Sequence, residues 1–256
     1  MMKRCAVVFL AVYVCCLSSV LQAAPASLPV WQKLENSGVS YRLYKQPEFV
    51  AHVFDVDLKL HQIRILNAGE NLQTHAYVRQ MVALWPWVIA SNASFFDESQ
   101  RVMGLVVNAG QVISKHLIKS WGILSVRLGH AEILSGQEFD WKSHASQADA
   151  VVQGLPRLVV HKKIPALKAQ SATRTIVCVN SSDKDNHHLF LIATSRVDTS
   201  LVAHFLVDEL GCEEALNLDG GPSTQLEARA GSFSLSIAGG WGVPNALVIL
   251  PVGVSP

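Results

Sequence analysis

The stretch LVAHFLVDELGCEEALNLDGGPSTQL, residues 201–226, decides the fold. Apolar side chains recur in it at helical spacing, which predicts a helix over residues 199–210. Gly211 is a natural helix stop. Residues 215–218 then form an apolar run that predicts a buried strand. A helix that leads into a buried strand is typical of a domain that contains both helices and sheets.

The turn after this strand carries the first candidate site. Asp219 stands at the carboxyl end of the strand, where a side chain is well placed to face a ligand crevice. Gly220 and Gly221 can take positive φ and let a ligand approach the backbone, while Ser223 and Thr224 can donate to phosphate or sugar oxygens. The alternative interpretation is a tight turn in which the carboxylate binds its own loop amides.

Strands outnumber helices along the rest of the chain. A further helix is predicted over residues 74–84, with Thr74 as its N-cap and Pro86 beyond its end. Alternation or apolar runs predict strands at 39–44, 50–58, 62–66, 87–91, 103–108, 111–114, 122–127, 132–134, 150–153, 157–160, 173–179, 189–193 and 246–250. We therefore expect an α+β fold, a single domain with a large mixed β-sheet and a few flanking helices.

The N-terminus has the pattern of a secretory signal peptide. Lys3 and Arg4 precede an apolar run over residues 6–21, and small residues follow at 23–26. We expect a signal peptide over residues 1–24 and a periplasmic or secreted protein, without a stable membrane span after cleavage. An uncleaved membrane anchor is the alternative.

The mature chain divides into a lead-in over residues 25–48 and one domain over 49–253. Half of the residues are hydrophobic, which allows a sizeable core. The formal net charge is only +1, and the sequence has no basic run or stripe, so we do not expect nucleic acid as a partner.

Cysteine and histidine spacing indicates no metal site. Cleavage removes three cysteines and leaves Cys178 and Cys212, which either form a disulfide or remain two buried thiols. The histidines lack metal-site spacing, and the acidic loop SSDKDNHH, residues 181–188, lacks the glycine and distal glutamate of a calcium loop. The sequence requires no cofactor, and dependence on a divalent metal stays open.

Two further features carry candidate binding residues. In SNASFFD, residues 91–97, Asn92 could bind sugar hydroxyls and Phe96 could stack on a sugar ring; alternatively, the aromatic residues are core and Asp97 caps a loop. Arg174 enters a strand after a polar segment and could clamp a phosphate, or it forms a structural ion pair.

Five segments together resemble the phosphodiester glycosidase family, which is named for the lysosomal "uncovering enzyme" that removes N-acetylglucosamine from a sugar phosphodiester. The resemblance covers residues 49–250. It runs through SNASFFD with MGLVVNAGQ, VQGLPRLV, SATRTIVCV, the opening stretch and VPNALVI. This chain departs from the family in having Pro222 in place of a third glycine, Trp241 near the position of a common arginine, and Lys162 with Lys163 where a glycine is frequent.

The resemblance implies a reaction and a set of site residues. The family breaks the bond between a sugar's anomeric carbon and a phosphodiester oxygen. Asp219 would then be the catalytic carboxylate, with Asp97 as a candidate second one, and Arg174 would bind the phosphate. The other implied substrate-binding residues are Asn92, Phe96, Gly220, Gly221, Ser223, Thr224 and Trp241.

The sequence therefore predicts an exported hydrolase that acts on a sugar phosphodiester. An alternative is a non-catalytic protein of the same fold that binds an envelope glycan or polymer. A third is a structural envelope protein in which the glycine-rich turn is only architectural.

Overall fold

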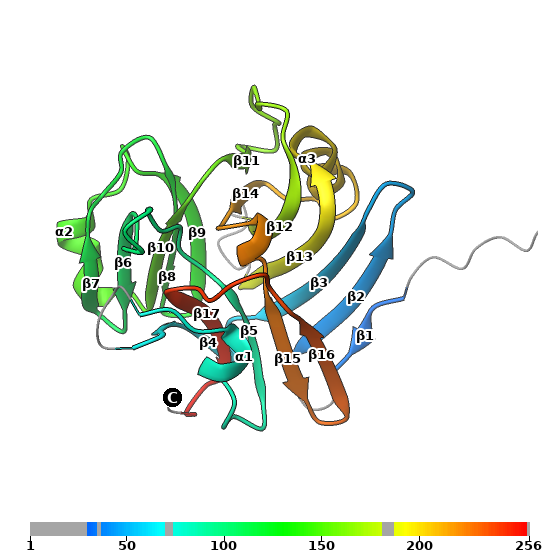
Figure 1. Cartoon of the computed structure of the whole chain (residues 1–256), viewed down its shortest axis with the longest axis horizontal. Coiled ribbons are helices and arrows are strands. Elements are labelled where there is room, and N and C mark those ends of the chain that lie inside the picture. The colour runs from blue at the N-terminus through cyan, green and yellow to red at the C-terminus, as the bar shows by residue number, and fades with distance from the viewer. Residues whose placement is uncertain (1–29, 35–36, 70–73, 181–186, 255–256) are drawn as a thin grey trace, which may run out of the picture.

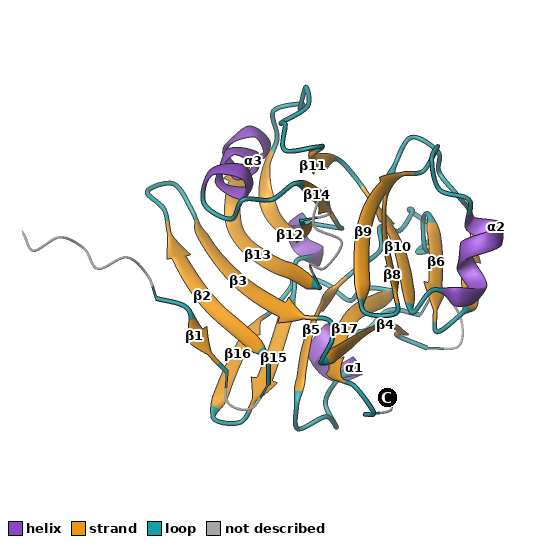
Figure 2. Ribbon diagram, turned by 180° about the vertical axis from the view of Figure 1, so that it is seen from behind, coloured by secondary structure: helices purple, strands orange, loops and turns teal. Residues whose placement is uncertain are grey.

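Three antiparallel β-sheets enclose a shared apolar core (Figures 1 and 2). The computed structural model describes residues 30–34, 37–69, 74–180 and 187–254. The predicted signal peptide, residues 1–24, lies outside these ranges, as does most of the acidic loop. Within the described ranges, no helix is long and apolar enough to cross a membrane.

The first sheet has seven strands and carries the longest helix, α3 (Thr199–Asp208). Its spatial order is β1 (Gln32–Lys33), β2 (Val39–Lys45), β3 (Val50–Asp57), β13 (His188–Asp198), β12 (Ser171–Val179), β14 (Glu214–Asn217) and β11 (Arg157–Val159). In β3, Phe54 and Val56 belong to the shared core, whereas Ala51 and Val53 belong to the cluster under α3. Both faces of the strand are therefore buried where the helix covers it. Because β2 pairs with β3 along its length, residues before 49 also contribute to the sheet.

The second sheet has five strands, in the order β7 (Gln111–Lys115), β6 (Leu105–Asn108), β10 (Ala150–Gly154), β8 (Gly122–Arg127) and β9 (His130–Ser135). The adjacent strands predicted at 103–108 and 111–114 form a hairpin, and Ala109 and Gly110 at its turn both have positive φ, as a tight hairpin turn requires. The short helix α2 (Trp141–His144) and the 3₁₀ turn η1 (Ala145–Gln147) lie between β9 and β10 in the chain.

The third sheet has five strands, in the order β16 (Phe233–Ile237), β15 (Leu226–Ala230), β5 (Val88–Asn92), β17 (Asn245–Pro251) and β4 (His61–Asn67). The β15–β16 hairpin was not predicted. Its signal was present, because Phe233, Leu235 and Ile237 alternate with serines after a turn at Gly231.

The predicted combination of β-sheet with a few helices is confirmed, although strands dominate, but the prediction of one large mixed sheet is wrong. The described strands form three separate sheets. Within each sheet, neighbouring strands pair antiparallel. Long apolar runs indicate burial on both faces, which parallel sheets also have. In the first sheet the same burial arises because its strands lie between the shared core and α3.

The predicted helix over residues 74–84 is much shorter in the structure. Helix α1 covers only Val78–Met81. Ala76 bridges to Val243, so the backbone before the helix is extended and Thr74 does not cap it.

A disulfide joins Cys178 of β12 to Cys212, which precedes β14. The two Cα atoms are 5.8 Å apart, and both side chains are buried. The bond ties β12 to the segment that leads into the glycine-rich turn.

Candidate functional site

The candidate site lies where the chain leaves β14 beside the end of β5. The amide of Leu218 donates to the carbonyl of Thr175 at 2.9 Å, and the amide of Asp219 donates to that of Ala93 at 3.1 Å. Asn92 Nδ2 donates to the carbonyl of Asp219 at 2.7 Å. Asp219 is thus fixed by backbone contacts to both the first and the third sheet.

Asn92 acts as a fixed spacer between these strands. Its side chain is fully buried, and its Oδ1 accepts from the Thr175 hydroxyl at 2.6 Å and from the Gln225 amide at 3.0 Å. It does not line the cavity described below, so the structure places it behind the turn that carries Asp219.

Asn245 supports the same turn from β17. It accepts from the Ser94 amide at 2.9 Å through Oδ1, and its backbone carbonyl accepts from the Ala93 amide at 3.3 Å. This role of Asn245 was not predicted, although the residue lies within the VPNALVI segment.

The two glycines after Asp219 are needed for different reasons. Gly221 has φ +61°, in the left-handed region, and begins the 3₁₀ turn η2 (Gly221–Ser223), drawn in orange in Figure 1. Gly220 is extended, but a Cβ there would lie 2.9 Å from the carbonyl oxygen of Thr173. The Thr173 hydroxyl also donates to the carbonyl of Gly221 at 2.6 Å, so β12 packs directly on the turn.

Asp219 opens into a cavity of about 670 Å³. Apolar parts of its wall come from Phe95, Leu155, Pro156 and Leu167. Its cations are Lys168, Arg174 and Arg196. Asp219 is the only carboxylate among the described residues that line it. The cavity therefore combines one carboxylate with three cationic side chains. This excess of positive charge suits an anionic ligand.

Burial raises the pKa of Asp219 from its ordinary value of 3.8 to about 6. Hydrogen bonds from the Ser223 side chain and from the Gly220 amide, the latter at 2.9 Å, oppose this rise. Trp241 Nε1 donates to Ser223 Oγ at 3.0 Å, which leaves the hydroxyl proton of Ser223 free to point at the carboxylate. Trp241, Ser223 and Asp219 thus form a hydrogen-bonded chain. The carboxylate is mostly ionised at pH 7 but titrates close to neutrality.

Arg174 is buried, with only 2% of its surface exposed. Its Nη2 donates to the Thr199 hydroxyl at 2.7 Å and to the carbonyl of Gln170 at 2.5 Å, and its Nη1 donates to Asn217 Oδ1 at 3.3 Å. Its Nε has no hydrogen-bond partner. Burial lowers the pKa of the guanidinium and the charge of Asp198 raises it. No carboxylate of the described residues forms a salt bridge with Arg174.

Two residues that line the cavity, Phe95 and Arg196, were not predicted as site residues. Phe95 lines the cavity, whereas the predicted Phe96 packs edge-on against His75, with ring centroids 4.6 Å apart. Arg196 of β13 was not predicted; it is exposed, and Nη1 donates to the carbonyl of Ser171 at 2.7 Å. A lone arginine in a strand has no local signal that marks it as a site residue.

Four other predicted residues do not line this cavity, and of these Ser223 reaches it only through its hydrogen bond to Asp219. Asp97 binds Arg101 through a 2.9 Å salt bridge, and the Arg101 amide and side chain hold the pKa of the carboxyl below its usual range. Trp241 is half exposed and reaches the site only through Ser223. Thr224 is buried next to the turn and lines a neighbouring cavity. Among the residues described, no group of three or more potential metal ligands is present.

Comparison with known proteins gives both a family and a fold. Residues 87–250 match the phosphodiester glycosidase family. The fold resembles the zebrafish N-acetylglucosamine-1-phosphodiester alpha-N-acetylglucosaminidase catalytic domain auto-inhibited by pro-peptide, with a TM-score of 0.61 and 16% identity over 90% of this chain and 85% of that chain.

Two further structures share the fold. A hypothetical protein from Synechocystis gives a TM-score of 0.62 and 15% identity over 88% of this chain and 64% of that chain. A Burkholderia pseudomallei protein, named provisionally as exported, gives a TM-score of 0.57 and 12% identity over 83% of this chain and 75% of that chain. None of the curated proteins matches the sequence. At these identities, the structural likeness establishes the fold alone.

Proposed function

This chain belongs to the phosphodiester glycosidase family, and we propose that it hydrolyses the bond between a sugar's anomeric carbon and a phosphodiester oxygen. The observation that carries the proposal is the pairing of one carboxylate, Asp219, with the cations Arg174 and Arg196 in one cavity. The proposed substrate is a sugar phosphodiester or an envelope glycan that contains one.

The nature of the leaving group explains why one carboxylate is sufficient. Ordinary glycosidases use a second carboxyl group as a general acid, because a sugar alcohol is a poor leaving group. Here the leaving group is a phosphate monoester, whose second pKa is about 6. It can leave as an anion when cations stabilise its charge. A cavity with one carboxylate and several cationic side chains matches this requirement.

Asp219 would work in its ionised form, by activating water or by stabilising the oxocarbenium ion. Burial raises its pKa, which makes the carboxylate a stronger base than one in water. The hydrogen bond from Ser223 keeps that pKa from rising further. The predicted role of Asn92 in orienting the sugar becomes, in this geometry, a role in positioning Asp219.

The cations would bind the phosphate. Arg174 lines the cavity and is anchored through both Nη atoms, so the position of its charge is fixed before substrate arrives. Arg196 is exposed and also lines the cavity, with one nitrogen held by the Ser171 carbonyl. Fixed donors aimed at developing negative charge are an effective way to stabilise a transition state.

Export to the periplasm or the cell exterior remains part of the proposal. It rests on the charged, apolar and small-residue segments at the N-terminus. Mass spectrometry of the mature protein tests it, since cleavage between about residues 23 and 26 is expected from that pattern.

A turnover screen tests the reaction. Methyl phosphodiesters of several sugar 1-phosphates are incubated with the protein, with and without divalent ions, and compared with the corresponding methyl glycosides. We expect free sugar and methyl phosphate from at least one phosphodiester, none from the glycosides, and none with Asp219→Asn. Tight binding of the phosphodiesters without any cleavage would instead support a glycan-binding protein.

A further inference from the structure

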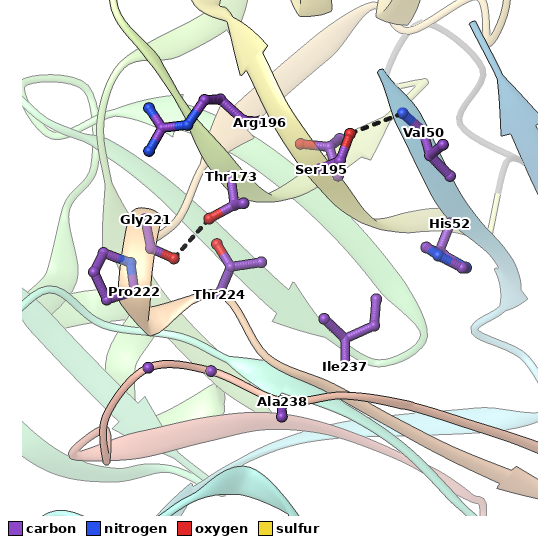
Figure 3. Close-up of a pocket in the computed structure, with 13 residues that line it drawn as sticks. Val50, His52, Thr173, Ser195, Arg196, Gly221, Pro222, Thr224, Ile237 and Ala238 are labelled. Atoms are coloured by element: carbon purple, nitrogen blue, oxygen red, sulfur yellow. Dashed lines mark hydrogen bonds between the residues drawn. The ribbon is translucent and has the colours of Figure 1, made fainter. Parts of the chain in front are cut away.

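A loop over residues 238–242, with the sequence AGGWG, packs against the turn at Gly221 and Pro222. Figure 3 shows Ala238, where the loop begins, on one side of a cavity of about 460 Å³ and Pro222 on the other. The Gly240 amide donates to the carbonyl of Pro222 at 2.7 Å, and a Cβ at Gly240 would come within 3.1 Å of the proline ring. The loop therefore contacts the turn that follows the candidate carboxylate.

The glycines of this loop leave Trp241 as its only side chain larger than a methyl group. A Cβ at Gly239 would lie 2.5 Å from the Gln225 side chain, and one at Gly242 would lie 3.2 Å from the Ala76 amide nitrogen. Gln225 is buried, and its Nε2 donates to the carbonyl of Trp241 at 3.0 Å. The backbone of Trp241 is thus held in place from one side, and its indole is fixed relative to the turn.

The hydrogen bonds that run from Trp241 to Asp219 have a single possible direction. Trp241 Nε1 donates to Ser223 Oγ at 3.0 Å, and the Ser223 side chain in turn binds Asp219. An indole N–H can only donate and an ionised carboxylate can only accept, whereas a hydroxyl group does both. Ser223 must therefore accept from Trp241 and donate to Asp219. Because Ser223 is only 2% exposed, water has little access to take the place of the indole.

Ser223 is the side chain that lowers the pKa of Asp219 against the effect of burial, and the Gly220 amide adds a smaller contribution. The charged side chains that line the cavity together with Asp219 are Lys168, Arg174 and Arg196. Trp241 is half exposed and lines neither this cavity nor the one in Figure 3. A change at Trp241 can therefore act on the carboxylate through Ser223 while the cations keep their places.

We propose that Trp241 is a positioning residue, whose indole N–H orients the Ser223 hydroxyl toward Asp219 and which itself does not touch the substrate. This inference rests on the proposed function for its place in the reaction. It assigns Trp241 a role that differs from the substrate contact implied by the family resemblance. Where the family commonly has an arginine, this chain has a neutral donor that acts from outside the cavity.

The variant Trp241→Phe keeps an aromatic ring and removes the N–H. Without that donor the Ser223 hydroxyl is free to rotate, so part or all of one hydrogen bond to the carboxylate is lost. The midpoint of the pH profile of kcat/KM should then move upward by about 0.3 to 1. At pH 5 the value of kcat/KM should fall roughly twofold to tenfold, while its plateau at pH 8 stays within about threefold.

A residue that contacts substrate, or one that merely supports the fold, would give the opposite pattern. The plateau at pH 8 would fall and the midpoint would stay in place, and this result would overturn the proposal. Trp141→Phe, at a partly exposed tryptophan of α2 that lines neither cavity, is the matched control and should change neither quantity. Replacing Trp241 by benzothienylalanine keeps the two-ring shape without the N–H, and it should reproduce the shift even if phenylalanine disturbs the loop.

A double-mutant cycle tests whether Trp241 acts through Ser223. Ser223→Ala removes the hydroxyl that links the indole to the carboxylate, so adding Trp241→Phe to this variant should move the midpoint no further. A further upward shift in the double variant, equal to that of Trp241→Phe alone, would show that the indole acts on Asp219 by another route. The proposal would then be wrong.

A titration without substrate separates this inference from the proposed function. Carbon NMR follows the aspartate side-chain carboxyl groups of the free protein across pH, and the signal missing from Asp219→Asn identifies Asp219. We expect the pKa of Asp219 to be higher in Trp241→Phe than in the wild type and unchanged in Trp141→Phe. If this holds while no phosphodiester is cleaved, the reaction is wrong and the positioning of Asp219 by Trp241 stands. If the pKa of Asp219 is the same in the wild type and in both variants of Trp241, the positioning role is wrong.

Discussion

Replacing Asp219 by asparagine should abolish turnover and stabilise the folded protein above pH 6. Asparagine keeps the size of the side chain and an oxygen that accepts from the Gly220 amide. It removes the negative charge that burial disfavours. A catalytic group held in an unfavourable environment is a common source of a trade-off between stability and activity.

The size of the effect follows from the two pKa values. The carboxyl titrates at about 6 in the folded protein and near its ordinary 3.8 in the unfolded chain. The two pKa values differ by roughly 2, and one pKa unit corresponds to about 1.36 kcal/mol. The loss of the charge can therefore stabilise the folded protein by at most about 3 kcal/mol. The cavity is open to solvent and the neutral amide binds Ser223 less strongly than a carboxylate does. We therefore expect about 1 to 2 kcal/mol.

The direction in which stability changes with pH follows from proton binding to Asp219. Between pH 3.8 and about 6 the folded protein holds more protons on Asp219 than the unfolded chain does, so its contribution to stability falls as pH rises through this window. Asparagine does not titrate. The stability difference between variant and wild type should therefore grow from pH 4 to pH 6 and stay constant above.

Urea unfolding at pH 4, 5, 6, 7 and 8 tests the predicted gain in stability, and turnover measured on the same preparations tests the predicted loss of activity. Turnover should fall at least ~10²-fold, the lower range for lost acid–base catalysis. Asp208→Asn, at an exposed carboxylate on α3, should change neither quantity. A variant that is less stable at every pH, by ~1 kcal/mol, and still active would show that Asp219 only caps its own loop.

Four further outcomes are expected. Arg174→Lys should weaken phosphate binding at least ~10-fold by calorimetry, because an ammonium lacks the fixed guanidinium fork; equal loss of neutral sugar binding would indicate a structural role. The pH profile of kcat/KM should rise with a midpoint near 6, and Ser223→Ala should move that midpoint upward, because the hydroxyl lowers the pKa of the carboxylate. Asp97→Asn should leave turnover within about threefold, since its partner is Arg101; a loss like that of Asp219→Asn would make it the second carboxylate. Reducing the disulfide, which spans 34 residues, should destabilise the protein by about 3 to 4 kcal/mol in chemical unfolding, and unchanged stability would contradict this.

Local sequence patterns predicted most of the elements that hold the site. The helix over 199–210 and the strand that follows it are present as α3 and β14, because their apolar spacing and glycine stop are encoded within a few residues. The arrangement of strands into three sheets was not predictable in this way. Pairings such as β5 with β17 join residues more than 150 positions apart.

The site was predicted where the signal was local and missed where it depended on packing. Asp219 follows one predicted strand and Arg174 lies near the start of another, and both residues line the cavity. Phe95 and Phe96 are adjacent, and only the folded backbone decides which of them faces the cavity. Arg196 lies there only because β13 pairs with β12.

The position of β17 couples the two ends of the third sheet to the candidate site. Asn245–Pro251 lie between β4 and β5, and β4 has no other partner among the described strands of its sheet. Asn245 also fixes the loop that receives the amide of Asp219. Local unfolding of this one strand would therefore leave every proposed catalytic residue in the chain, yet it would release the loop that holds Asp219 and separate β4 from its sheet. The order of the site depends on the stability of β17.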